Sequence, residues 1–166
     1  MTTPQLLTYA VAVGFVLLLL AAAIADIARR RVPNWTVFGL IAVYGLALVV
    51  GHAPSEWWSG LGAAVIVLLV TYGLYHFEVI GAGDSKLFSA AALFVGLPHL
   101  ATFALLTVLV GGAMAAVVIV ANPRRVMRGM TAAGRAEGKG RGVPYGVAIA
   151  SGAIATQVLN GSLAFS

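Results

Sequence analysis

Residues 5–25 read QLLTYAVAVGFVLLLLAAAIA, a run of 21 residues without a charged side chain. A helix needs about 20 predominantly apolar residues to cross the hydrocarbon core of a bilayer, so this run is long enough to span it. The run ends at Asp26, and the basic cluster Arg29-Arg30-Arg31 follows closely. No Lys or Arg precedes it, whereas a secretory signal peptide begins with positive charge. The stretch therefore predicts a first transmembrane helix.

The composition of the whole chain also indicates a protein that lies in the lipid bilayer. Of the 166 residues, 61% are hydrophobic and only 9% are charged, and the mean hydropathy is +1.00. A soluble domain is about 45–50% apolar and about 25% charged, so a water-soluble globular domain and a disordered chain are both excluded. The sequence contains no cysteine, which excludes a disulfide framework, a thiol nucleophile and a cysteine metal site.

Five further apolar runs follow the first one. They are Trp35–Val50, Trp57–Phe77, Leu87–Leu97, Leu100–Ala121 and Pro144–Phe165. The runs are continuous rather than alternating, which favours helices over the strands of a β-barrel. The fourth span is long enough only if the polar residues on both sides, including the Pro98-His99 turn, form its ends. The sequence therefore predicts an all-α integral membrane protein, a six-helix transmembrane bundle in which residues 1–166 form a single domain.

Basic residues are distributed unevenly among the loops. All ten lie after the first, third and fifth spans, and the chain has a net charge of +5. Because positive charge is retained in the cytoplasm, these three loops are expected inside and both termini outside. Residues 122–142 form a Gly- and Arg-rich segment, expected to be a mobile cytoplasmic loop against anionic lipid. No aromatic residue interleaves its basic residues, so nucleic acid is not an expected partner.

Two of the five acidic residues stand at the ends of predicted membrane helices. Asp26 closes the first span and Asp84 opens the fourth, which places both at the cytoplasmic side. Ionisable residues at membrane depth are costly and are functional candidates, and these two can pair if the first and fourth helices pack side by side. Structural roles are also open, because Asp26 could pair with the arginines after it and Asp84 could cap its helix. Gly81 and Gly83 favour a turn that another backbone can approach, which a cap alone does not need.

Three segments carry a resemblance to a known family. Asp26-Ile27-Ala28-Arg29-Arg30-Arg31-Val32-Pro33-Asn34 is similar to an aspartate motif that ends in a Pro-Asn turn. Gly81-Ala82-Gly83-Asp84-Ser85-Lys86-Leu87 resembles a GxGD motif followed by Lys and Leu, and Val143-Pro144-Tyr145-Gly146-Val147-Ala148 resembles the Pro-Tyr-Gly opening of a last helix. Together they resemble the type IV prepilin peptidases, small aspartic membrane proteases of the GxGD type, in particular those of tight-adherence (Flp) pili.

The resemblance implies an aspartic endopeptidase of the bacterial inner membrane, with Asp26 and Asp84 as the catalytic pair. The supporting motif positions are Pro33, Asn34, Gly81, Gly83, Lys86, Pro144 and Tyr145. The implied substrate is a prepilin, whose short basic leader stays in the cytoplasm while its apolar helix lies in the bilayer. No cofactor or metal is expected, and the sequence has no H-E-x-x-H motif. Which aspartate acts first as the base stays open, although helix ends slightly favour a charge on Asp84.

Two further functional questions follow from the resemblance. Larger relatives also N-methylate the new pilin terminus with a cysteine-bearing segment near their N-terminus. This chain begins its first span at about Gln5 and has no cysteine, so peptidase activity without N-methyltransferase activity is expected. The alternative function is a small ion-coupled membrane transporter that uses Asp26 and Asp84 as a cation site.

The ten basic residues predict the topology directly. Reporter fusions at Gly134 and at Ser166 should give opposite answers, with Gly134 in the cytoplasm and Ser166 outside, because positive loops are retained inside. A paired periplasm-active and cytoplasm-active reporter measures this. Matching signals from the two fusions would contradict the six-span arrangement.

Overall fold

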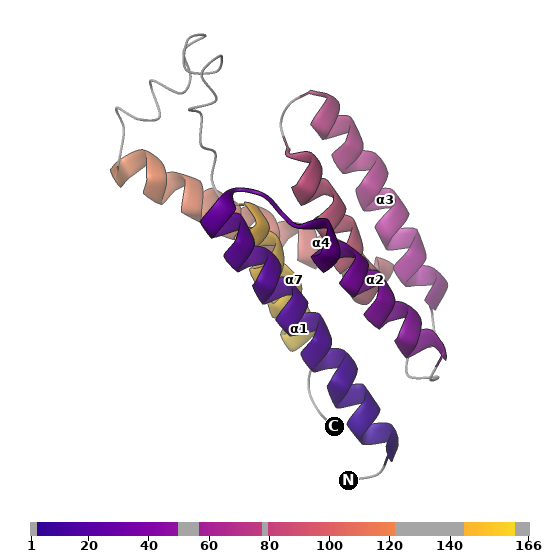
Figure 1. Cartoon of the computed structure of the whole chain (residues 1–166). Coiled ribbons are helices and arrows are strands. Elements are labelled where there is room, and N and C mark those ends of the chain that lie inside the picture. Colours follow the sequence, from indigo (N-terminus) through magenta and orange to yellow (C-terminus); the bar gives the residue numbers. More distant parts are fainter. Residues whose placement is uncertain (1–2, 50–56, 78–79, 122–144, 162–166) are drawn as a thin grey trace.

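The computed structural model describes residues 3–49, 57–77, 80–121 and 145–161 (Figure 1). Within these ranges the chain forms five helices, which are α1 (Thr3–Arg29), α2 (Asn34–Val49), α3 (Trp57–His76), α4 (Ala82–Ala121) and α7 (Tyr145–Leu159). Three of them, α1, α3 and α4, are long and apolar enough to cross a membrane, and α2 and α7 are shorter apolar helices. The prediction of a helical membrane protein is confirmed. The basic loop at 122–142 lies outside the described residues.

The described residues form five helices where six were predicted, because the fourth and fifth predicted helices are the two parts of the kinked α4. The expected spans Leu87–Leu97 and Leu100–Ala121 are both parts of α4, which is interrupted rather than ended between them. The interruption is at Gly96, with φ 73° and ψ 170°, a positive-φ conformation that essentially only glycine adopts. Pro98 follows and has no N–H for the helical hydrogen-bond ladder. Figure 1 shows the second half of α4 leaving the first at an angle.

Side chains of two neighbouring helices hydrogen-bond two backbone groups at this break. The Leu97 N–H donates to Ser59 Oγ of α3 at 2.9 Å. The Phe94 carbonyl, whose helical donor would be the N–H that Pro98 lacks, accepts from Gln157 Nε2 of α7 at 2.7 Å. Ser59 and Gln157 are both buried. Because lipid offers no hydrogen bonds, these contacts make a broken helix tolerable at membrane depth.

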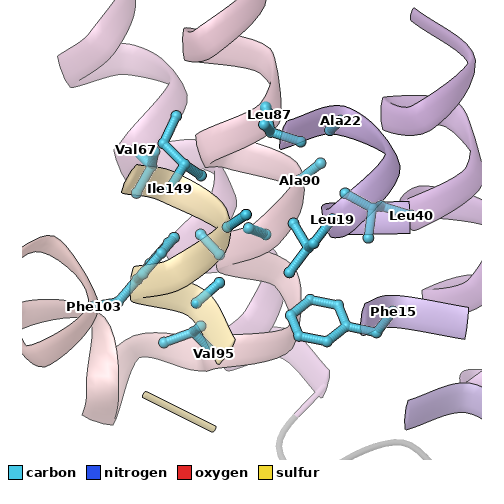
Figure 2. Packing of buried hydrophobic residues seen from close by; sticks show 14 of the residues in the cluster. Phe15, Leu19, Ala22, Leu40, Val67, Leu87, Ala90, Val95, Phe103 and Ile149 are labelled. Atoms are coloured by element: carbon cyan, nitrogen blue, oxygen red, sulfur yellow. The ribbon is translucent and has the colours of Figure 1, made fainter. Parts of the chain in front are cut away.

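The helices pack through small residues and expose large apolar ones. α7 packs against both α1 and α4, α2 packs against the same two helices, and α3 packs against α4. Larger side chains from four helices complete the core that Figure 2 shows, namely Phe15, Leu19, Leu40, Leu87, Phe103 and Ile149. Buried alanines lie among them, Ala22, Ala90, Ala91, Ala92, Ala150 and Ala153. Exposed leucines, valines and aromatic residues cover the outer faces, as expected of helices packed closely within lipid.

The helix ends that carry the two aspartates lie at one end of the bundle. Figure 1 shows the beginning of α1 and the end of α7 toward the lower end, whereas the end of α3 and the beginning of α4 lie at the upper end. The end of α1 and the beginning of α7 also lie away from that lower end. The two predicted aspartates, at the end of α1 and the beginning of α4, therefore belong to the same end of the protein.

Replacing Gln157 with Leu should destabilise the protein, because the buried Phe94 carbonyl loses its donor. We expect a cost of about 1–2 kcal/mol and a lower midpoint of thermal unfolding in detergent. The matched control is Asn160→Leu, which removes an exposed amide just beyond the same helix. Equal midpoints for the two variants would contradict this account of the break.

Candidate active site

Asp26 is held by the beginning of α7. It lies in the last turn of α1 and is 6% exposed. Its Oδ2 accepts a hydrogen bond of 2.8 Å from the N–H of Gly146, the second residue of α7. The first N–H groups of a helix have no partner within the helix, and the helix dipole makes this end positive. The end of α7 thus supplies both a donor and a favourable field for a carboxylate anion.

Gly146 is the residue that allows this contact. A Cβ at this position would lie 2.9 Å from Asp26 Oδ2, 3.0 Å from Asp26 Cβ and 3.2 Å from its Cγ. Any side chain there would push the carboxylate away from the helix. Sequence reasoning missed Gly146 as a site residue, although the Pro-Tyr-Gly string that contains it was the signal that could have found it.

Asp84 lies in the first turn of α4 and is partly buried. The two glycines before it create room on different sides. A Cβ on Gly81 would lie 3.1 Å from Asp84 Oδ2, so this glycine leaves space for the carboxylate. A Cβ on Gly83 would lie 3.3 Å from Val32 Cβ and 3.6 Å from Val32 N, so the link between α1 and α2 can approach α4 closely. Neither glycine has a positive φ, and close approach is what they provide.

The structure brings the two predicted catalytic residues together. Asp26 stands in the last turn of α1 and Asp84 in the first turn of α4, and these two helix ends lie at the same end of the bundle. Pairing was expected only if the first and fourth helices pack side by side. The Phe15 ring of α1 and the Phe94 ring of α4 meet with their centroids 4.5 Å apart, and α7 packs against both helices. Figure 2 shows Ala22, one turn before Asp26, and Leu87, three residues after Asp84, at the same end of the core. The carboxylate pair therefore lies at one end of the apolar interior.

The predicted Pro-Asn turn shapes the chain reversal after Asp26. Arg30 adopts φ 54°, and its N–H donates to the Asp26 carbonyl at 2.8 Å as α1 ends. The Pro33 carbonyl accepts both the Thr36 hydroxyl, at 2.7 Å, and the Thr36 N–H, at 3.2 Å. Asn34 is the first residue of α2 and is exposed. These residues turn the chain so that its link can meet the beginning of α4.

The remaining supporting residues differ in their surroundings. Tyr145 begins α7, and its ring packs on α4, where a Cβ on Gly111 would lie 3.2 Å from Tyr145 Cε1. Tyr145 therefore fixes the beginning of α7, which carries the donor to Asp26. Lys86 is exposed on α4. Pro144 lies outside the described residues.

A buried hydroxyl pair lies directly beside Asp84, and sequence reasoning did not single it out. Ser85 Oγ is 2.6 Å from Thr71 Oγ1 of α3. Nothing in the order of residues shows that these two side chains meet, because the rotation of α3 against α4 cannot be read from apolar runs. The pair ties the turn that carries Asp84 to a third helix.

The chemistry available here is that of two carboxylates. In the part of the chain that the structure describes, no three His, Cys, Asp or Glu side chains gather into a metal-binding group. Two carboxylates at one site share a proton, so one can accept a proton while the other donates one. This is the requirement for general acid–base attack of water on a carbonyl group.

Comparison with known proteins identifies the family. The model described as the type IV leader peptidase family matches residues 13–116. This region contains Asp26, Asp84 and both glycines before Asp84, and it ends before α7. Searches of curated proteins and of solved structures find no match.

Replacing Gly146 with Ala should destabilise the protein by about 1–3 kcal/mol, because the new Cβ overpacks against the Asp26 carboxylate. The matched control is Gly112→Ala, since a Cβ at Gly112 meets nothing within 4 Å. That control should be neutral or slightly stabilising, because Ala is the better helix former. Thermal unfolding in detergent measures both variants. A Gly146→Ala protein as stable as the control would contradict the close contact.

Proposed function

The chain belongs to the type IV leader peptidase family, and from this premise we propose that it is a membrane aspartic endopeptidase that removes the basic leader of Flp-type prepilins. The observation that carries the proposal is that Asp26, in the last turn of α1, and Asp84, in the first turn of α4, lie at the same end of the bundle, with α7 packed against both helices. The family match covers both aspartates. Ionisable residues at membrane depth are costly and are functional candidates by default, which supports a role for both carboxylates.

In the proposed reaction the two carboxylates share one proton, and their surroundings divide the roles. The Gly146 N–H and the positive end of α7 favour a charged Asp26. Asp26 then takes a proton from water, whose oxygen attacks the scissile carbonyl carbon, while Asp84 donates its proton to the carbonyl oxygen. As the tetrahedral intermediate collapses, the carbon–nitrogen bond breaks, and the proton held by Asp26 passes to the leaving amine. One hydroxyl of the intermediate returns its proton to Asp84 as the new carboxyl group forms, which restores the starting state of the pair. This assignment reverses the slight preference for Asp84 as base, which took no account of α7.

The position of the site suits a substrate that crosses the membrane boundary. The excess of basic residues favours a cytoplasmic location for the end of the bundle that carries both aspartates, with the chain termini outside, in a bacterial inner membrane. A prepilin leader would lie on that side, and its apolar helix would lie in lipid beside the exposed apolar faces of the enzyme. We propose hydrolysis alone, since the methyl transfer of larger relatives uses cysteines and these 166 residues contain none.

Asp26→Asn and Asp84→Asn should each abolish leader cleavage, a loss of at least about 100-fold, because an amide cannot take part in the proton transfers. Asn has nearly the shape of Asp and is itself a good helix cap, so the fold should persist. The measurement is the cleaved fraction of a co-expressed prepilin, normalised to the amount of peptidase in the membrane.

The charge-matched control is Glu137→Gln, which removes a carboxylate from the basic loop of the sequence. It should leave cleavage unchanged. Substantial cleavage by an Asp84→Asn variant that is present at normal levels would end the aspartic-protease proposal. It would direct attention to the alternative, an ion-coupled transporter, for which cation-dependent uptake is the assay.

A further inference from the structure

The turn that carries Asp84 is fastened to α3 by two buried hydroxyl groups. Thr71 is 2% exposed and Ser85 is 5% exposed, and their oxygens are 2.6 Å apart. Ser85 is the residue after Asp84, and its N–H donates to the Gly81 carbonyl at 3.0 Å within the same turn. A contact at Ser85 therefore acts on the turn that carries the carboxylate.

The hydrogen bond between these hydroxyls has a defined direction. The single proton of Thr71 Oγ1 is used toward the Val67 carbonyl of its own helix, at 2.7 Å. Thr71 Oγ1 is therefore the acceptor, and Ser85 is the donor across the helices. A bond with one possible direction fixes the orientation of Ser85 as well as its distance from α3.

This bond controls rotation of the first turn of α4. Consecutive residues of a helix project about 100° apart, so Ser85 is directed at α3 while Asp84 is directed elsewhere around the axis. Gly81 and Gly83, before Asp84, have no side chains that could pack against neighbouring helices and fix the turn. Gly83 instead rests against Val32 on the side of the α1–α2 link. Val32 on one side and Thr71 on the other thus set how far the turn can rotate.

We propose that Thr71 and Ser85 are positioning residues that fix the Asp84 carboxylate relative to Asp26. The inference rests on the proposed peptidase function. Two carboxylates that share a proton and activate one water must keep their separation, and a misplacement of about 1 Å can cost about 100-fold in rate. The hydroxyl pair contacts neither water nor substrate in this role and acts only through Asp84.

The test compares Thr71→Val, Ser85→Ala and the double variant, as purified proteins in detergent with a prepilin substrate. Each single variant should lower kcat about 10-fold or more, and KM should stay within about twofold because the substrate contacts are unchanged. Thr71→Ser retains the acceptor and should retain kcat. The matched control is Thr156→Val, since Thr156 is also buried and donates to a carbonyl four residues earlier, in α7.

The double variant separates positioning from stability. Thr71→Val leaves the buried Ser85 hydroxyl without its acceptor, whereas the double variant removes both polar groups and should regain thermal stability. Under the proposal its kcat remains as low as that of the single variants. Recovery of kcat together with stability would overturn the proposal, as would a kcat within twofold of wild type for Thr71→Val. Absence of cleavage by the wild-type protein would instead count against the proposed function itself.

Discussion

The hydrogen bond from the Gly146 N–H to Asp26 Oδ2 joins α7 to α1, and the arrangement of the candidate site depends on it. Through this contact α7, which packs against both α1 and α4, brings together two helices that carry one aspartate each. The contact requires glycine, because a Cβ at position 146 would collide with the carboxylate. The site is therefore a product of three helices, with two supplying carboxylates and the third supplying a donor and a positive helix end.

The break in α4 contributes to the same site from a distance. Gly96 redirects the chain, and the second half of α4 then packs closely on α7. A Cβ on Gly152 would collide with Thr107 Oγ1, and the Tyr145 ring rests on Gly111, so α7 is held along its length. Ser59 and Gln157 stabilise this break in lipid, because they hydrogen-bond the Leu97 N–H and the Phe94 carbonyl. Ser59 and Gln157, which lie far from the aspartates, thus help to position the Gly146 N–H that donates to Asp26.

Sequence reasoning could predict the features that depend on local pattern. Apolar runs predicted the helices, their order predicted that Asp26 and Asp84 stand at helix ends on the same side, and the two glycines at 81 and 83 indicated close approach. The features that were missed depend on which helix faces meet. Ser59 bonds a residue 38 positions away and Gln157 one 63 positions away, and the Gly146 contact joins residues 120 positions apart. Hydropathy indicates how long an apolar helix is, but not how it is rotated or which helices it contacts. For the same reason the two parts of the kinked α4 were predicted as two separate spans.

The two aspartates differ in a way that suits the proposed division of labour. Asp26 is buried and receives a backbone N–H, which cannot rotate away as a side-chain donor could. Asp84 is partly exposed, and its turn contains glycines at 81 and 83, so little side-chain bulk hinders a peptide that approaches it. An acid must reach the carbonyl oxygen of an incoming substrate, whereas a base needs only a water molecule between itself and that carbonyl. The fixed carboxylate therefore suits the base and the accessible one suits the acid, an asymmetry created by α7 and by the turn at the beginning of α4.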